Sequence, residues 1–378
     1  MLPGRARPTR RRLHREMPRR PHPGRFCPGC APSTIYQRLH PTDYCRLFIG
    51  SFRTHFFSSL PKKIDKTSGP GPAFCLCSMP CLATSERYSI TLPASHRFPI
   101  AKYALIREQL LWQGIAPPED FYDPGLAAEE DILRVHSADY WHRVRDGQLT
   151  AAEVRRLGLP QSPELVRRSL SSVAGTVESA RRALQDGIGL SLAGGTHHAF
   201  HDRGEGFCVL NDIAVAAAHL LHHGRARQVL VVDLDVHQGD GTASIFRNEP
   251  RVFTFSMHAG ANYPLRKEQS DLDVALDLGT DDETYLRILH NTLPRLLAEV
   301  RPDFVFYQAG VDVLATDKLG KLALTQTGCR QRDAYVLGLC RKAGLPVAVS
   351  MGGGYSEQLR DIVDAHCNTF RVAYELYG

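Results

Sequence analysis

The sequence lacks any apolar run close to the ~20 residues that a helix needs to span a bilayer, so no membrane association is expected. Acidic residues are nearly absent from one end: residues 1–78 hold fifteen Lys and Arg but only three Asp and Glu. The other 300 residues hold 31 basic and 37 acidic residues, a net charge of −6. The overall charge of +6 therefore gives no reason to expect that the body of the chain binds nucleic acid directly.

Residues 1–78 also show no sustained hydrophobic period and no clean signal-peptide pattern. Their Arg- and Pro-rich composition allows three interpretations: a disordered basic extension, an organelle transit peptide, or a start site placed too far upstream, with Met79 as a later start. We favour disorder or a misplaced start, which makes residues 79–378 the expected folded domain. The expected location is the cytoplasm; a transit peptide would imply an organelle, and a eukaryotic source would allow the nucleus.

Cysteines are scarce in the body of the chain, since six of the ten lie in the first 81 residues. The four in the body are scattered, as expected for reduced core thiols in a cytosolic protein: Cys208, Cys329, Cys340 and Cys367. Cys27 and Cys30 have the spacing of a metal or redox pair. They lack a second Cys/His pair and a βαβ context, so we interpret them as unpaired thiols.

From about Tyr88 onward, helical and strand patterns alternate. Strands are expected at 188–193, 229–236, 252–257, 274–278, 304–309 and 346–351. Helices are expected at 100–114, 127–145, 163–186, 211–223, 282–300, 328–343 and 356–376. The alternation predicts a single-domain α/β fold, in which helices cover both faces of a mostly parallel sheet in three α/β/α layers.

The chain is organised around the stretch 229–241, where an apolar strand runs into Asp233, Asp235 and His237. Side chains at i and i+2 of a strand share a face, so these three are expected to point the same way at its carboxyl end. Ligands bind at that end in open α/β sheets. Asp312 follows another strand and would complete a set of two oxygens and one nitrogen with Asp235 and His237. Such a set leaves an open coordination position, as catalytic zinc sites require.

Two further strand ends carry polar motifs. His197 and His198 follow a pair of glycines, and histidine is the side chain best suited to exchange protons near neutral pH. Tyr355 follows three glycines that can bring the backbone close to a ligand, and its hydroxyl can donate a hydrogen bond. At one sheet edge these groups would supply a metal, a proton-transfer pair and an oxyanion donor, which favours metal-assisted hydrolysis of a carbonyl compound.

The sequence resembles the zinc-dependent histone deacetylase family, which has the arginase–deacetylase fold. The resemblance extends from about Ser89 to the C-terminus and is carried, in family order, by the motifs at 194–198, 204–212, 233–241, 309–312 and 352–355. Gln238, the 317–320 stretch and the 92–99 stretch are most similar to the class IV and bacterial branch. Residues 79–378 are thus expected to be a histone-deacetylase-like catalytic domain.

The resemblance implies a role for each motif. It assigns Zn²⁺ to Asp235, His237 and Asp312, proton transfer to His197 and His198, and the oxyanion hydrogen bond to Tyr355. It also implies that Asp233 and Asp240 orient the histidine pair, that Gly206, Phe207, Tyr263 and Gly353 line a substrate channel, and that Asp233 and Ser256 belong to a potassium site. Five histidines match no catalytic role and are interpreted as helix-surface or loop residues: His201, His219, His222, His223 and His258.

The expected activity is zinc-dependent hydrolysis that removes acetyl or longer acyl groups from lysine side chains of proteins or peptides. Two alternatives stay open: a deacylase of small amides such as acetylpolyamines, and a non-catalytic acyl-lysine-binding module on the same fold. The sequence favours no particular acyl length, target or oligomeric state. Two-manganese ureohydrolases share the fold but are disfavoured, because the extra acids that bridge a second metal are absent.

Overall fold

The computed structural model describes residues 80–93 and 95–378. The predicted basic extension, with Cys27 and Cys30, lies outside these residues. The four cysteines of the body are buried and form no disulfide, as predicted for core thiols. Within the described ranges, no helix is both long and apolar enough to cross a membrane.

Eight strands form one sheet in the order β2-β1-β3-β8-β7-β4-β5-β6, and every neighbouring pair is parallel. Their bounds are β1 Leu82–Ala83, β2 Phe121–Tyr122, β3 Ile188–Ser191, β4 Val229–Asp233, β5 Val252–Ala259, β6 Leu272–Leu276, β7 Phe304–Gln308 and β8 Val347–Ser350. The four central strands β3, β8, β7 and β4 are buried along their whole length. Strands covered on both faces need apolar side chains on both, which explains their nearly continuous hydrophobic runs.

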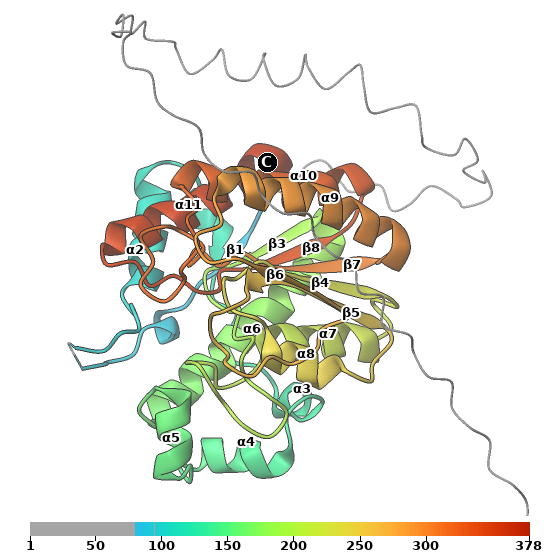
Figure 1. Ribbon diagram of the computed structural model, residues 1–378. Helices are drawn as coiled ribbons and strands as arrows, with labels where there is room; N and C mark the ends of the chain where they lie inside the picture. Colours follow the sequence, from blue (N-terminus) through green and yellow to red (C-terminus); the bar gives the residue numbers. More distant parts are fainter. Residues whose placement is uncertain (1–79, 94) are drawn as a thin grey trace, which may run out of the picture. The chain divides into compact units, whose positions relative to one another are not determined.

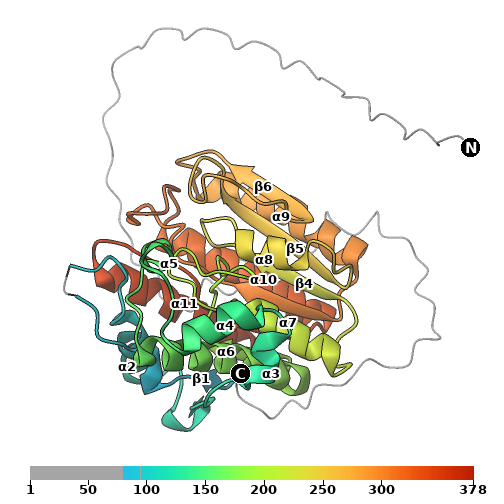
Figure 2. The same cartoon turned by 90° about the horizontal axis from the view of Figure 1, so that it is seen from below.

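Helices cover both faces of the sheet (Figure 1). On one face lie α9 Asp282–Val300, α10 Gln326–Ala343 and α11 Leu359–Tyr377, with α2 Lys102–Trp112 packed against α11. On the other lie α6 Pro163–Asp186, α7 Asp212–His222 and α8 Asp240–Phe246. The short helices α3 Glu129–Leu133, α4 Ala138–Arg145 and α5 Ala151–Leu157 gather beyond α6 and α7 (Figures 1 and 2). The predicted three-layer α/β/α fold is confirmed, with a sheet that is parallel throughout.

The single helix predicted at 127–145 is wrong, because the chain breaks between α3 and α4. His136 lies buried in the break, where its Nε2 accepts the Asn211 backbone N–H at 2.9 Å and its Nδ1 donates to the Phe200 carbonyl at 2.9 Å. Ser137 then caps α4 by accepting the backbone N–H of Tyr140. Hydrogen bonds between His136 and the backbone of distant residues thus take the place of the helical hydrogen bonds that would join α3 to α4.

Several short elements escaped prediction because they are too brief to show a period: β1, β2, α5 and α8. The strand predicted at 229–236 ends earlier, at Asp233. Asp235 and His237 therefore stand on the loop after β4, and strand alternation is the wrong explanation for their convergence. His258 is buried in β5 beside Ser256, so its interpretation as a surface or loop residue is also wrong.

Candidate active site

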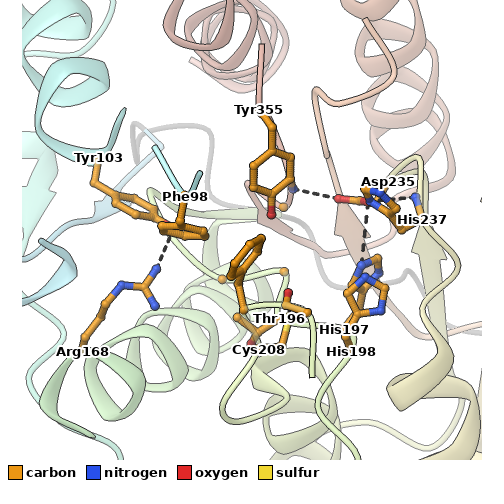
Figure 3. Close-up of a pocket in the computed structure, with 16 residues that line it drawn as sticks. Phe98, Tyr103, Arg168, Thr196, His197, His198, Cys208, Asp235, His237 and Tyr355 are labelled. Carbon is orange, nitrogen blue, oxygen red and sulfur yellow. Dashed lines mark hydrogen bonds and ion pairs between the residues drawn. The ribbon is translucent and has the colours of Figure 1, made fainter. Parts of the chain in front are cut away.

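The loops that follow β3, β4 and β8 line one pocket, and Asp312 on the loop after β7 lies beside Asp235 and His237 of that lining. Since these strands are neighbours and parallel, their carboxyl ends meet at one edge of the sheet. The pocket is lined by Phe98, Tyr103, Arg168, Gly194, Gly195, Thr196, His197, His198, Gly206, Phe207, Cys208, Asp235, His237, Gly352, Gly353 and Tyr355 (Figure 3). Most of the residues singled out in the sequence are thus brought together in one place.

Asp235, His237 and Asp312 form a buried group whose possible ligand atoms all lie within 4.8 Å of one another. His237 Nδ1 is 3.1 Å from Asp235 Oδ1 and 3.2 Å from Asp312 Oδ2. Among the described residues, Asp312 Oδ2 is buried without a hydrogen-bond partner. Burial and the neighbouring Asp235 raise the pKa of Asp312 to about 7. Two buried carboxylates, one with an oxygen that accepts no hydrogen bond, are what a bound cation would stabilise, so this group fits a metal ion.

Glycines allow the backbone to approach these carboxylates. A Cβ on Gly353 would lie 1.9 Å from Asp312 Oδ2, and one on Gly310 would lie 2.4 Å from Asp235 Oδ2. Gly353 also donates its backbone N–H to Asp235 Oδ2 at 2.8 Å. Gly353, predicted to line the channel, therefore both lines the pocket and holds a candidate ligand in place.

Each histidine of the pair is held by its own carboxylate. His197 Nδ1 lies 2.7 Å from Asp233 Oδ2, and His198 Nδ1 lies 2.6 Å from Asp240 Oδ1. Burial lowers the pKa of His197, but Asp233 and Asp235 outweigh that effect and bring its pKa to about 9. Burial together with the charge on His197 brings the pKa of His198 to about 4. The two rings, 4.1 Å apart, therefore differ in proton affinity, and His198 stays neutral and able to accept a proton.

The loop that carries the pair is anchored by Asp212, at the start of α7. Its buried carboxylate accepts the backbone N–H of Gly195 at 3.0 Å, that of Thr196 at 2.7 Å and the Thr196 hydroxyl at 2.6 Å. Asp212 belongs to the 204–212 motif, for which no role of this residue was predicted. The available signal was an acid at a helix start directly after Asn211, a residue type that caps helices.

Tyr355 projects its hydroxyl into the pocket, toward the side that carries the histidine pair (Figure 3). Its backbone N–H is held by Asp317 Oδ2 at 2.6 Å, and its ring lies 6.3 Å from that of Phe98 and 5.9 Å from that of Phe207. Burial, with Asp312 and Asp235, raises the pKa of Tyr355 well above 10. The hydroxyl therefore keeps its proton at neutral pH and can donate a hydrogen bond.

Aromatic rings form the pocket walls. Phe207 packs against Phe98 at 5.4 Å and takes a positive φ of 69°. Tyr263 stands edge-on to His198 at 4.9 Å, and a Cβ on Gly206 would lie 2.8 Å from His198 Cδ2. All three predicted channel residues, Gly206, Phe207 and Tyr263, thus lie beside the histidine pair or the pocket. A narrow aromatic wall suits the apolar stem of an extended side chain.

Phe98, Tyr103 and Arg168 line the pocket but received no role from the sequence. Arg168 is buried within α6, donating from Nε to the Tyr88 carbonyl at 3.0 Å and from an Nη to the Tyr103 hydroxyl at 2.8 Å. Figure 3 places these three on the side of the pocket away from the histidine pair. The signal that could have found Arg168 is a lone cation on the apolar face of a 24-residue helix.

The predicted potassium residues also lie together, since Asp233 and Ser256 are direct partners across β4 and β5. Both are buried. Potassium at this position stays a prediction.

Fold and pocket define the class as an α/β protein with a candidate metal centre at the carboxyl edge of its sheet. The chain belongs to the histone deacetylase family, because the family model described as "Histone deacetylase domain" matches residues 96–370. The family resemblance predicted from the motifs is thereby confirmed.

Curated relatives span this domain. An uncharacterized protein from Picosynechococcus is 47% identical over 77% of this chain and 97% of its own length. Histone deacetylase 2 of Arabidopsis thaliana is 28% identical over 71% of this chain and 72% of its own. The acetoin utilization protein AcuC of Staphylococcus aureus is 28% identical over 68% of this chain and 72% of its own. The solved HDA15 HD domain has a TM-score of 0.66, with 23% identity over 77% of this chain and 90% of that one, and shows the same fold.

Proposed function

We propose that this histone deacetylase family member is a zinc-dependent amide hydrolase that removes acyl groups from lysine side chains of proteins or peptides. The observation that carries the proposal is convergence. The histidine pair, Asp235, His237 and Tyr355 come from three separate loops and line one aromatic-walled pocket. Asp312, on a fourth loop, offers a ligand atom within 4.8 Å of those of Asp235 and His237. Membership of the family supports the same activity.

Zinc is the metal that the family resemblance implies for this donor set. Two carboxylates and one imidazole would hold it with a coordination position left open. When bound, the ion would polarise the scissile carbonyl and acidify a water beside it.

The chain's own residues account for the proton transfers. Neutral His198 accepts the proton of the attacking water, and the imidazolium that results is stabilised by Asp240 at 2.6 Å. The Tyr355 hydroxyl donates to the carbonyl oxygen as negative charge grows on it. His198 then returns its proton to the departing lysine amine, which prevents re-attack and completes the hydrolysis.

Hydrolysis of a small amide is the second candidate. One relative that matches 68% of this chain is named for acetoin utilization, and its name points to small-molecule metabolism. A pocket lined by aromatic rings would accept a slender acylated amine as readily as an acyl-lysine side chain.

A substrate panel distinguishes the candidates. The full chain, loaded with zinc, is assayed on lysine peptides carrying acetyl through myristoyl groups and on acetylpolyamines, with and without a hydroxamate chelator. The proposal predicts chelator-sensitive release from at least one peptide. Turnover of acetylpolyamines alone would contradict the lysine-deacylase proposal and support hydrolysis of small amides. Zinc binding without any turnover would favour a non-catalytic binding module.

A further inference from the structure

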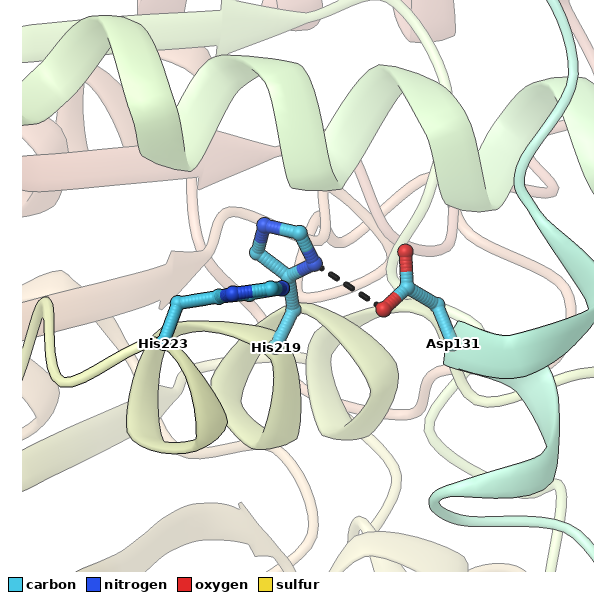
Figure 4. Close-up of side chains that lie close together, drawn as sticks. All are labelled: Asp131, His219 and His223. Carbon is cyan, nitrogen blue, oxygen red and sulfur yellow. Dashed lines mark hydrogen bonds and ion pairs between the residues drawn. The ribbon is translucent and has the colours of Figure 1, made fainter.

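A second group of possible metal ligands lies outside the pocket. Asp131 of α3, His219 of α7 and His223, which directly follows α7, offer ligand atoms that all lie within 4.8 Å of one another (Figure 4). The two histidines are one helical turn apart and so share a face of α7, and Asp131 faces them from the neighbouring helix. None of the three residues lines the pocket already described.

Two members of this group are already in position. His219 Nδ1 lies 2.9 Å from Asp131 Oδ1, and their side chains are only 18% and 15% exposed. The ring of His223 stands 4.4 Å from that of His219. Among the described residues, both hydrogen bonds to the Asp131 carboxylate, from the His219 and Arg134 side chains, fall on Oδ1, which leaves Oδ2 available.

The remaining adjustment is small. Ligand atoms at the corners of a tetrahedral zinc site are about 3.4 Å apart, given Zn–N and Zn–O distances near 2.1 Å. His223 is exposed and can turn its ring toward the other two without disturbing the core. The group also lies at the C-terminal end of α7, where the helix dipole favours a cation.

We propose that Asp131, His219 and His223 form a second, surface site for a divalent transition-metal ion of the zinc type, with water completing the coordination. Two imidazole ligands suit Zn²⁺, Cu²⁺ and Ni²⁺ and give little affinity for Mg²⁺, which prefers oxygen ligands. A His219–Asp131 ion pair alone would explain one contact. It would not explain why His223 also offers a ligand atom within 4.8 Å of both residues.

A bound ion would link α3 to α7 through its ligands. The opposite end of α7 carries Asp212, which anchors the loop of the histidine pair. The chain directly after α3 carries His136, which holds the backbone of Asn211 and of Phe200. An ion joining α3 to α7 would therefore stabilise the support behind that loop, and we expect it to change thermal stability more than turnover.

Metal binding to the full chain tests the proposal. The full chain carries Asp235→Asn, which disables the metal-ligand group of the pocket. It is stripped of metal with a chelator and titrated with Zn²⁺ at pH 7.5, and both the heat of binding and the number of bound ions per chain are measured. This background keeps the test independent of the proposed function. One ion should still bind per chain. Adding His223→Ala should weaken that binding at least tenfold, whereas the matched control His222→Ala, an exposed neighbour outside the group, should leave it intact.

Thermal unfolding provides the second readout. Added Zn²⁺ should raise the Tm of the Asp235→Asn and Asp235→Asn/His222→Ala proteins but not that of Asp235→Asn/His223→Ala. If Asp235→Asn does not fold, the same comparison is made in the unmodified chain, where His223→Ala should bind one ion fewer than His222→Ala. Equal zinc affinity and stoichiometry in the His222 and His223 variants would overturn the site.

Discussion

At the scale of single residues, Tyr355 offers the sharpest test of the proposed chemistry. Tyr355→Phe removes only a hydroxyl that points into the pocket, and loss of one oxyanion donor costs about 10²–10³-fold in kcat. We expect that fall in steady-state kinetics, with bound metal unchanged. Tyr335→Phe, which removes a hydroxyl bonded only to the His290 carbonyl in the described residues, is the control and should keep full activity. Undiminished turnover in Tyr355→Phe would exclude its hydroxyl as the donor.

Asp317 is the residue that positions Tyr355. Its carboxylate accepts the backbone N–H groups of Tyr355 at 2.6 Å, Leu319 at 2.8 Å and Gly320 at 2.9 Å, which joins two loops. Asp317→Asn places an amide donor against one of these N–H groups, so we expect kcat to fall roughly tenfold as the Tyr355 loop shifts. KM and metal content should change little. Loss of metal together with turnover would show that Asp317 supports the ligand group instead.

At the scale of elements, the break between α3 and α4 makes the fold sensitive to acid. Burial lowers the pKa of His136 to about 4, against about 6.5 in the unfolded chain. Below pH 6.5 the unfolded chain binds a proton that the folded chain refuses, so stability falls as the pH drops and levels off near pH 4. The loss attributable to His136 is about 3 kcal/mol.

Denaturant unfolding between pH 4 and 7.5 measures this effect. His136→Gln, which can keep one of the two backbone hydrogen bonds, should be less stable at pH 7.5 but should show a shallower decline toward acid. If the two proteins lose stability in parallel as the pH falls, other groups cause the acid sensitivity.

Sequence periodicity predicted the long helices and strands. It failed where contacts with residues distant in the sequence determine the end of an element. The apolar runs of β4, β7 and β8 and the glycines that follow them were readable, because buried parallel strands and close backbone approach have local signatures. The end of β4 was not readable, since the backbone N–H of Val236 turns to Asp312 Oδ1, 76 residues away. The break at His136 has the same origin.

At the scale of the whole molecule, the pocket is assembled from segments between residues 98 and 355. The metal-ligand candidates and the histidine pair could be predicted because each stands at a strand end. A lone cation on an apolar helix face could mark Arg168 as buried. The place of Phe98, Tyr103 and Arg168 in the pocket could not be predicted, because it depends on the packing of α6 against the 98–103 segment, as the hydrogen bond between Arg168 and Tyr103 shows. Side chains that meet only through tertiary packing have no characteristic spacing in the sequence that would mark them as neighbours.

The most direct test of the account is turnover of an acetyl-lysine peptide by the full chain as a function of bound zinc. The chain is stripped of metal, reloaded in steps, and assayed beside an Asp312→Asn variant. We predict that the stripped protein is inactive, that zinc restores turnover, and that Asp312→Asn stays inactive at every zinc level. Turnover by the stripped protein, or full turnover by Asp312→Asn, would contradict a metal-dependent hydrolase built on this pocket.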